Sequence, residues 1–178
     1  RVPIRITVDL IDKAVAITKN PILGLAWFQR NGCSHNSSIF SAVYSTANVR
    51  AMLDMVMRYM HLMTEMGDFR LYSINDTAVL EFLPVKVPDI SDHQVDAMLL
   101  AITEFFKPVI EGSVTRVLLK HACPLGYQSD YDDAFHASVV FSQDKYALEF
   151  PAEWLKKSLQ GKSISIDELV DLEKLSSH

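Results

Sequence analysis

The sequence predicts an α+β domain in which several N-terminal helices pack with a mostly antiparallel sheet of about four to five strands. Apolar residues recur at helical spacing through the first third of the chain and again over 91–109. Short apolar or alternating runs, which are typical of strands, occupy 69–74, 77–83, 114–120, 139–141 and 146–150. Of the 178 residues, 49% are hydrophobic and 22% are charged, so one globular domain over 1–178 is expected.

The N-terminal third is expected to be helical. Thr7 is placed to cap a first helix, which Asn20–Pro21 ends. Asn20 can also cap a second helix, because Pro21 then occupies the first helical position, where a missing N–H costs nothing. A third, short helix is expected over 38–44. The inward face of the first two helices consists of Val8, Ile11, Ala14, Val15, Ile22, Leu25, Ala26 and Phe28.

The longest predicted helix spans 47–63, is capped by Thr46 and contains five methionines. Its polar residues form one wedge, and the other positions are apolar over a wider arc than an ordinary surface helix shows, so burial on two sides is expected. Met fills irregular gaps and also lines surfaces that accept varied apolar partners. Two interpretations therefore stay open, ordinary core or the wall of a ligand cavity. The polar wedge consists of Arg50, Asp54, Arg58 and His61.

Turn and capping signals place the next elements. Asn75–Asp76, between two strand-like runs, predicts a β-hairpin. Ser91 with Gln94 forms a capping box, which predicts a helix that Pro108 bends or ends. A strand over 114–120 follows. The predicted apolar face of the helix consists of Val95, Met98, Leu99, Ile102, Phe105, Phe106 and Val109.

The rest of the chain alternates strand and helix signals. In order, the expected elements are a strand that ends in His121, a short amphipathic helix around Tyr131 and Phe135, strands over 139–141 and 146–150, an apolar Trp154–Leu155 tail, and a last helix opened by a capping box of Ser165 and Glu168. Periodicity supports this fold class, but it does not determine the order of the strands in the sheet.

The net charge of −5 argues against direct contact with nucleic acid, because a domain that neutralises phosphates usually presents a basic face. No apolar run approaches the roughly 18 residues of a membrane span. The two cysteines, Cys33 and Cys123, show neither metal-ligand spacing nor the framework of a secreted protein. These patterns predict a soluble, cytoplasmic protein that makes no membrane contact.

Few residues suggest chemistry. Four roles are open to His121: a hydrogen-bonded structural residue, a ligand contact, a metal ligand with Cys123, or part of a Cys–His nucleophilic pair. The structural role is favoured. The acidic run over 130–133 fits a solvated helix start, and Cys33–His35 fits a loop. Because no phosphate-binding loop, nucleophile elbow or paired-carboxylate signature occurs, no catalytic residue, metal or cofactor is predicted, and an enzyme is not expected.

Three stretches carry a family resemblance. "NPILGLAWFQRN" at 20–31 looks like "DPxLGLRxG", and "SIFSAVYSTANVRAMLDMVMRYMHLM" at 38–63 looks like "GLLGYALLSSPTLGEALRLLARYFRLL". The third stretch follows "FxHxxPxxxxxYxxxFxxPVxFxxxxNxLxF", although Tyr146 stands where that pattern has Asn. Together they resemble the N-terminal effector-binding domain, often labelled arabinose-binding, of AraC-type transcriptional regulators. The matching residues of the third stretch are His121, Pro124, Tyr131, Phe135, Val139, Phe141, Leu148 and Phe150.

The resemblance implies a ligand-sensing regulatory domain. Such domains sense a small metabolite, for example an amino acid or a fatty acid, commonly pair as homodimers, and control a C-terminal helix-turn-helix domain that binds DNA. That DNA-binding domain is expected to lie outside these 178 residues. A lining of Met and aromatic residues favours an elongated or partly apolar effector. The expected lining of the pocket consists of Tyr44, Met52, Met55, Tyr59, Tyr72, Phe106 and His121.

Two other functions stay open. The Met-rich flank of the helix over 47–63 could meet another protein, which would make the chain a dimerisation or partner-docking module without a ligand. Alternatively, His121 or His61 could be the axial ligand of a haem or gas sensor, which would absorb light at about 400 nm. Absorbance of the purified protein separates the haem sensor from the other two functions, and native mass spectrometry separates a ligand-binding domain from a docking module.

Overall fold

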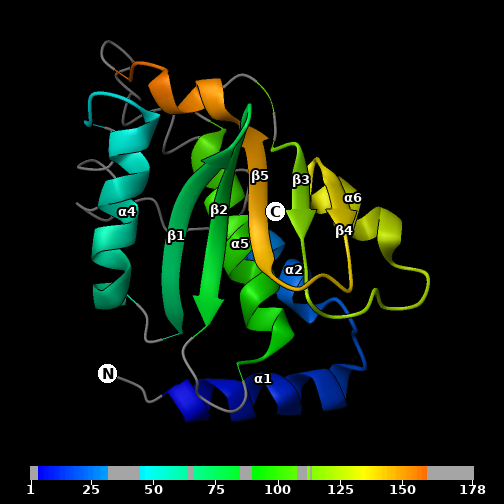
Figure 1. Cartoon of the computed structure of the whole chain (residues 1–178). Coiled ribbons are helices and arrows are strands. Elements are labelled where there is room, and N and C mark those ends of the chain that lie inside the picture. Colours follow the sequence, from blue (N-terminus) through cyan, green and yellow to red (C-terminus); the bar gives the residue numbers. More distant parts are fainter. Residues whose placement is uncertain are drawn as a thin grey trace.

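The computed structural model describes residues 4–31, 45–63, 66–84, 90–107, 112 and 114–159 (Figure 1). The predicted helices over 38–44 and after Ser165, like Cys33–His35, lie outside these residues. In chain order, the elements are α1 (Ile4–Thr18), α2 (Leu23–Asn31), α4 (Val49–Met63), β1 (Gly67–Ile74), β2 (Thr77–Pro84), α5 (Asp92–Phe106), β3 (Arg116–Leu118), α6 (Gln128–Phe135), β4 (Ser138–Val140), β5 (Tyr146–Pro151) and the 3-10 helix η1 (Ala152–Lys156).

The five strands form one sheet in the order β1-β2-β5-β3-β4. Every neighbouring pair is antiparallel except β3 and β4, which run parallel. The predicted α+β fold with a mostly antiparallel sheet is therefore confirmed. The predicted hairpin is confirmed as well, because Ile74 pairs with Thr77 across Asn75–Asp76. Asn75 adopts the left-handed backbone (φ 53°) that tight hairpin turns use.

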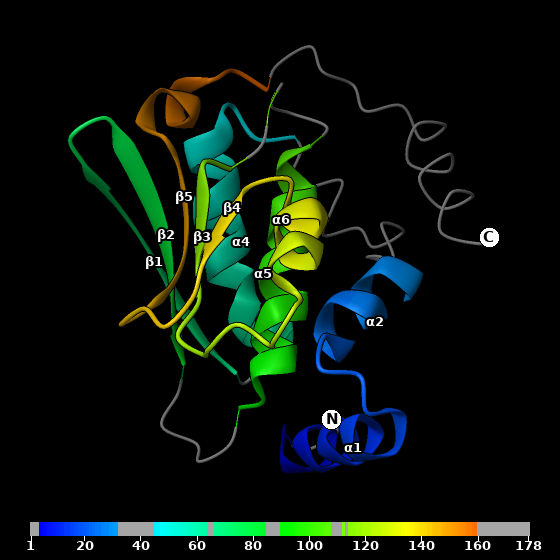
Figure 2. The same cartoon turned by 90° about the vertical axis from the view of Figure 1, so that its right-hand side faces the viewer.

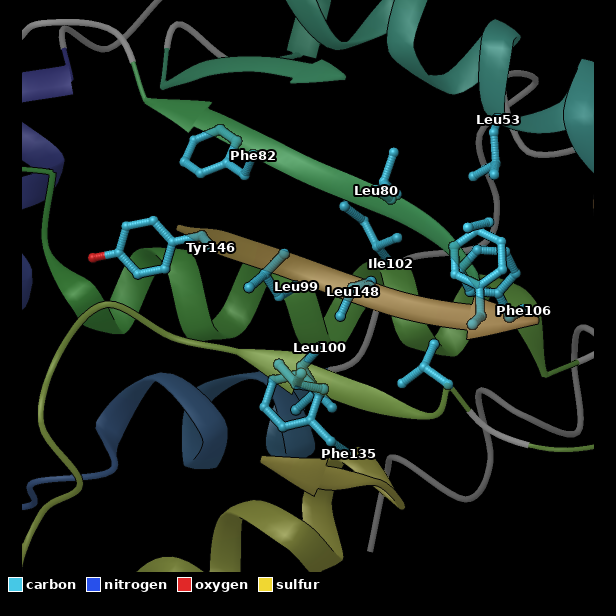
Figure 3. Close-up of a cluster of buried hydrophobic side chains, with 14 of the residues drawn as sticks. Leu53, Leu80, Phe82, Leu99, Leu100, Ile102, Phe106, Phe135, Tyr146 and Leu148 are labelled. Atoms are coloured by element: carbon cyan, nitrogen blue, oxygen red, sulfur yellow. The ribbon is translucent and has the colours of Figure 1, made fainter. Parts of the chain in front are cut away.

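The described helices lie on one side of the sheet (Figure 2). α5 crosses the middle of the covered face, where Leu99 and Ile102 lie beside Leu80 of β2 and Leu148 of β5 (Figure 3). α2 and α6 pack against α5 as well. α5 is thus enclosed on more than one side, and polar residues on this helix are buried along with the apolar ones. The buried polar residues of α5 are Gln94, Asp96 and Thr103.

The Met-rich helix α4 contacts β1 and η1. Its polar wedge is exposed as predicted at Arg50, Asp54 and Arg58. Over the described side chains of α4, up to Arg58, one flank is fully buried in the core, whereas the next is only half-buried, so this part of the helix is less enclosed than its composition suggested. The fully buried residues are Val49, Met52 and Leu53, and the half-buried ones are Met55, Val56 and Met57.

The opposite face of the sheet carries a smaller apolar cluster between two cross-strand ion pairs. Arg70 donates to Glu81 at 2.8 Å, and Nε of Arg116 donates to Glu149 at 2.8 Å. Such pairs fix neighbouring strands in register, although pairs with an exposed arginine contribute little to stability. The apolar members of the cluster are Val79, Leu118 and Ala147, packed with Tyr72 and Val140.

The start of α4 differs from the prediction. Asn48 caps this helix in place of Thr46, because the Asn48 Oδ1 accepts the N–H of Ala51 at 2.9 Å. The reason is a tertiary contact: Asn48 forms an isolated antiparallel bridge with Ser158, in which its backbone is extended and cannot be helical. The hydrogen bonds of this bridge run from the Val49 N–H to the Lys157 carbonyl and from the Leu159 N–H to the Ala47 carbonyl, each at 3.1 Å.

Two other boundaries differ. α1 begins at Ile4, one turn before the buried Val8, so Thr7 lies inside the helix and does not cap it. β3 ends at Leu118, because the following backbone bonds the loop after β4 instead of β5; the Ser142 N–H, for example, donates to the His121 carbonyl at 2.9 Å. His121 therefore lies in a loop beyond the strand, where its side chain reaches α5.

Candidate functional site

A pocket of about 300 Å³ opens between the C-terminal ends of α5 and α6. This volume falls at the lower end of the roughly 300–1,000 Å³ that small-molecule sites occupy. The pocket is built by three stretches that are distant in sequence, so only the folded chain creates it. Its lining consists of Thr103, Phe106, Lys107, Gly112, Val114, Phe135 and His136.

The floor of the pocket is apolar and belongs to the hydrophobic core. Phe106, Val114 and Phe135 are almost completely buried. The ring of Phe106 lies 5.2 Å from that of Phe150 on β5 and 6.4 Å from that of Trp154 on η1. These ring contacts hold the floor against the sheet. A ligand here would therefore bind on a rigid aromatic surface.

Gly112 keeps one side of the pocket open. Its backbone has φ 127°, a conformation that residues with a side chain rarely adopt. A Cβ atom at this position would lie 3.5 Å from the indole of Trp154. The lack of a side chain thus leaves room between the chain and η1.

The polar groups of the pocket lie at the ends of the two helices. The Thr103 hydroxyl donates to the Leu99 carbonyl at 3.0 Å, and the Lys107 ammonium lies 2.5 Å from Glu104. His136 follows α6 with a left-handed backbone (φ 49°). The geometry supports noncovalent binding, with an apolar floor and a few polar groups at the helix ends.

A second feature is the polar network around Asp96 in the middle of the fold. Asp96 lies on α5 and is only 1% exposed. Its Oδ1 lies 3.0 Å from Nε2 of His121, and its Oδ2 accepts the hydroxyl proton of Tyr131 on α6 at 2.7 Å. One carboxylate thus links α5 to α6 and to the loop after β3.

The contacts of His121 favour its protonated form. Its Nδ1 lies 3.0 Å from the Ala122 carbonyl, so both ring nitrogens face oxygen acceptors and both must donate. Burial disfavours the charged ring, but the hydrogen bond and the charge of Asp96 outweigh that cost and raise the pKa of His121 above 6.5. Burial, together with the charge and hydrogen bond of Asp96, also raises the pKa of Tyr131, so its hydroxyl remains a donor.

The residues predicted to line a pocket are spread over the fold. Phe106 is part of the pocket between α5 and α6. Met52 is fully buried in the core, and Met55 is half-buried beside it. Tyr72 lies on the opposite face of the sheet, where its hydroxyl accepts a hydrogen bond from Lys145 at 3.4 Å. His121 belongs to the Asp96 network. Tyr44 and the side chain of Tyr59 lie outside the described residues.

Sequence reasoning did not single out most of the pocket or the key carboxylate. Thr103 and Lys107 each come directly after a residue of the predicted apolar face of α5. His136 comes directly after the last apolar residue of α6. The helical patterns therefore do not mark these three residues as ligand contacts. One signal was present for the network: Asp96 interrupts the apolar run of a helix that is otherwise built for burial. A buried acid in such a place needs a cationic or donor partner.

The contacts of His121 and Cys123 bear on the metal and haem interpretations. Both nitrogens of His121 are engaged, one by Asp96 and one by the Ala122 carbonyl, so neither presents a lone pair to a metal. The thiol of Cys123 donates to the Pro124 carbonyl at 3.3 Å and not to His121. The side chain of His61 lies outside the described residues.

The sequence matches a protein family described as the arabinose-binding domain of AraC transcription regulators, N-terminal, over residues 1–159. The chain belongs to this family. It is thus an effector-binding domain of the AraC type, from a family of transcription-regulator domains and not of enzymes. No curated protein sequence shows significant similarity to the chain.

One solved structure with the same fold is the crystal structure of transcriptional regulator CdpR from Pseudomonas aeruginosa. The two share 16% sequence identity with a TM-score of 0.59, and the match covers 83% of this AraC-type domain. It covers 55% of the CdpR chain, so the domain spans about half of that regulator's length. In the described part of the AraC-type domain, no helix combines the length and apolar character needed to cross a bilayer.

Proposed function

We propose that this domain is the sensory part of an AraC-type regulator, in which a small metabolite binds between α5 and α6 and controls a DNA-binding domain outside this chain. The observation that carries the proposal is the pocket between the C-terminal ends of these two helices, in a chain of an effector-binding family. Cytoplasmic action on DNA through that other domain fits the acidic net charge of −5.

The two helices are fixed to each other near the opposite end of α5 by Asp96 and Tyr131. A ligand in the pocket therefore acts on helices that are already tied at one end, and it favours whichever packing of α6 on α5 leaves room for it. Such a ligand shifts an equilibrium only through its different affinity for the two packings. Phe106 of α5 is held by its ring contacts with Phe150 and Trp154, so α6 is expected to be the element that adjusts.

Filling the pocket is expected to abolish ligand binding without unfolding the domain. Val114→Phe adds volume at the pocket floor, where the empty space of the pocket can take up the larger side chain. The same change at Val117, which is fully buried in the closed core, should cost about 1–3 kcal/mol through overpacking. Thermal unfolding with a panel of small metabolites measures both effects, since a ligand raises Tm only by binding the folded state.

The proposal is overturned if Val114→Phe keeps the full thermal response to a metabolite that stabilises the unmodified protein. It is also overturned if Val114→Phe and Val117→Phe lose stability equally, because then the floor of the pocket is packed like the rest of the core. A lost response with retained stability supports the pocket as the sensing site.

We further propose that the domain pairs as a homodimer through α1. Leu10 and Ile17 are 60% and 82% exposed, and with Ala14 they form a stripe at the i, i+4, i+7 spacing of helices that pack together. Sedimentation at about 100 μM should show a dimer, since an interface near 800 Å² per partner normally holds at that concentration. The double variant L10K/I17K should sediment as a folded monomer. A monomer before substitution would count against pairing.

A further inference from the structure

We propose that His121, Asp96 and Tyr131 form a proton-controlled switch, in which loss of the proton from the His121 ring releases the loop over 122–126 and changes how α6 packs on α5. The switch needs no ligand, so it is an input separate from the proposed pocket. Three features of the described residues support it: the two acceptors that face the ring, the charges beside the ring, and the direct connection of the loop to α6.

Both nitrogens of the His121 ring face oxygen acceptors. Nε2 lies 3.0 Å from Oδ1 of Asp96, and Nδ1 lies 3.0 Å from the carbonyl oxygen of Ala122. A protonated ring donates to both, whereas a neutral ring has one N–H and one lone pair. Loss of the proton therefore sets a lone pair against an oxygen atom. Because the bond to the carboxylate is the stronger of the two, the contact with Ala122 is the one that breaks.

The charges beside the ring oppose the loss of its proton. Asp92 and Asp96 lie one turn apart on α5, and both attract the charged form of His121. Without that positive charge, two like charges remain at a spacing that destabilises a helix. In the described part of the chain, the titratable and charged groups around the ring are Asp92 and Asp96 of α5, Tyr131 of α6, Tyr146 of β5, and Lys120 and Cys123, which lie near His121 in sequence.

The sign of the pH response follows from the direction of the pKa shift. Burial disfavours the charged ring of His121, but the hydrogen bond and the charge of Asp96 outweigh burial and raise the pKa above 6.5. The switch is therefore closed below about pH 6.5 and opens as the pH rises through the raised pKa. Burial raises the pKa of Tyr131, Tyr146 and Cys123, so these groups keep their protons over the same interval.

The ring itself is held in place, so the loop is the part that moves. The centroid of the His121 ring lies 5.4 Å from that of Phe141, which it meets edge-on, and 6.1 Å from that of Tyr131. In contrast, the loop over 122–126 is mostly exposed, and its Leu125 is 98% exposed. Moving this loop removes little apolar surface from contact, so the motion costs little.

The loop leads directly into α6. The N–H of Tyr127 donates to the carbonyl of Pro124 in the loop at 3.1 Å. Tyr127 is the N-cap residue of α6, and its carbonyl accepts the N–H of Tyr131 at 3.3 Å. A shift of the loop therefore acts on the first turn of α6, where the hydroxyl of Tyr131 is bonded to Asp96 of α5.

The test is an NMR titration of the full chain from about pH 5.5 to about pH 9, an interval that brackets the ordinary pKa of histidine. It follows the ring shifts of His121, the amide shift of Gly126 and the amide exchange of Tyr131. We expect the ring to titrate with a pKa above 6.5 and the Gly126 shift to have the same midpoint. The protection of the Tyr131 amide, corrected for the intrinsic rate of exchange, should fall about three- to tenfold, as expected for one lost hydrogen bond.

Two histidine variants separate the switch from general effects of pH. His121→Gln has no ionisable side chain at this position, so the Gly126 shift and the corrected protection of Tyr131 should become independent of pH. His136→Gln removes an exposed histidine directly after α6, and it should keep both transitions.

Several outcomes contradict the switch. It is ruled out if the His121 ring titrates while the Gly126 amide does not follow, if the transition persists in His121→Gln, or if the ring has a pKa of 6.5 or lower. A loop that moves without any change in the protection of Tyr131 refutes the connection to α6. If His121→Gln does not fold, the unmodified protein decides the question, because coincident midpoints of the ring and the Gly126 amide support the switch and separate midpoints exclude it.

Discussion

Replacing Asp96 by alanine is expected to lower the free energy of unfolding by about 3–5 kcal/mol, because it leaves two buried hydrogen-bonding groups without their partner. The Asp96 carboxylate accepts hydrogen bonds from His121 at 3.0 Å and from Tyr131 at 2.7 Å, and it is 1% exposed. Without it, Nε2 of His121 and the hydroxyl of Tyr131 lose their acceptor inside the fold. Chemical denaturation followed by circular dichroism measures the loss.

The matched control lies one turn earlier on the same helix. Asp92 accepts the hydroxyl proton of Tyr146 at 2.6 Å, but Asp92 itself is exposed to solvent. Because water can replace this acceptor, Asp92→Ala should cost only about 1 kcal/mol. Equal losses for the two alanine variants would show that burial of the carboxylate does not determine the cost.

The network also predicts a pH dependence with a definite sign. The folded state raises the pKa of His121 above 6.5, so folding favours the protonated ring. The stabilisation is complete below about pH 6.5 and is lost as the pH rises through the raised value in the folded state. As the pH rises from about 6.5 through the raised pKa of the folded state, the denaturation midpoint of the unmodified protein should approach that of His121→Gln. A difference that grows with rising pH would contradict the assignment.

Substituting Gly24 by valine is expected to detach α2 from α5, with a loss of about 3 kcal/mol or more. A Cβ atom at Gly24 would lie 2.2 Å from the carbonyl oxygen and 2.9 Å from the Cα of His93. Both are backbone atoms of α5, which cannot rotate away as a side chain can. The helices must separate by more than an ångström, and the core contacts of Leu25 are lost with them. Tm and amide exchange of α2 report the result.

Gly126 provides the control for this substitution. It has φ 85°, and no atom lies within 4 Å of a Cβ built there. Gly126→Val therefore meets backbone strain only, worth about 1–2 kcal/mol. If Gly24→Val is no more harmful than Gly126→Val, the close approach of α2 and α5 is not a constraint on the fold.

Local signals predicted the elements well, because each depends on neighbouring residues. The capping box of Ser91 and Gln94 opens α5, and Asn75–Asp76 closes the hairpin. The insertion of β5 between β2 and β3 could not be predicted from the sequence. Strand pairing between residues more than 60 positions apart, such as Leu80 and Leu148, produces no periodic pattern along the chain. The same limit explains the cap of α4, where a bridge to Ser158 selects Asn48 over Thr46.

The candidate site was harder to predict, because its residues are distributed over α5, α6 and the segment before β3. The helical wheel of α4 identified a broad apolar surface but did not show what covers each flank. Of the predicted lining residues whose side chains the structure describes, only Phe106 borders the pocket between α5 and α6. The sequence predicted His121 as a structural residue above other roles, and its position depends on Asp96, a partner 25 positions away.

The bridge between Asn48 and Ser158 connects the end of the described chain to the start of α4. A displacement of the backbone at Lys157 or Leu159 would strain its hydrogen bonds to Val49 and Ala47, and it would therefore act directly on the start of α4. Met52 and Leu53 of α4 are buried in the hydrophobic core, so a shift of this helix would also affect the core packing. A shift of the backbone at Ser158 and a shift of the start of α4 are therefore expected to occur together.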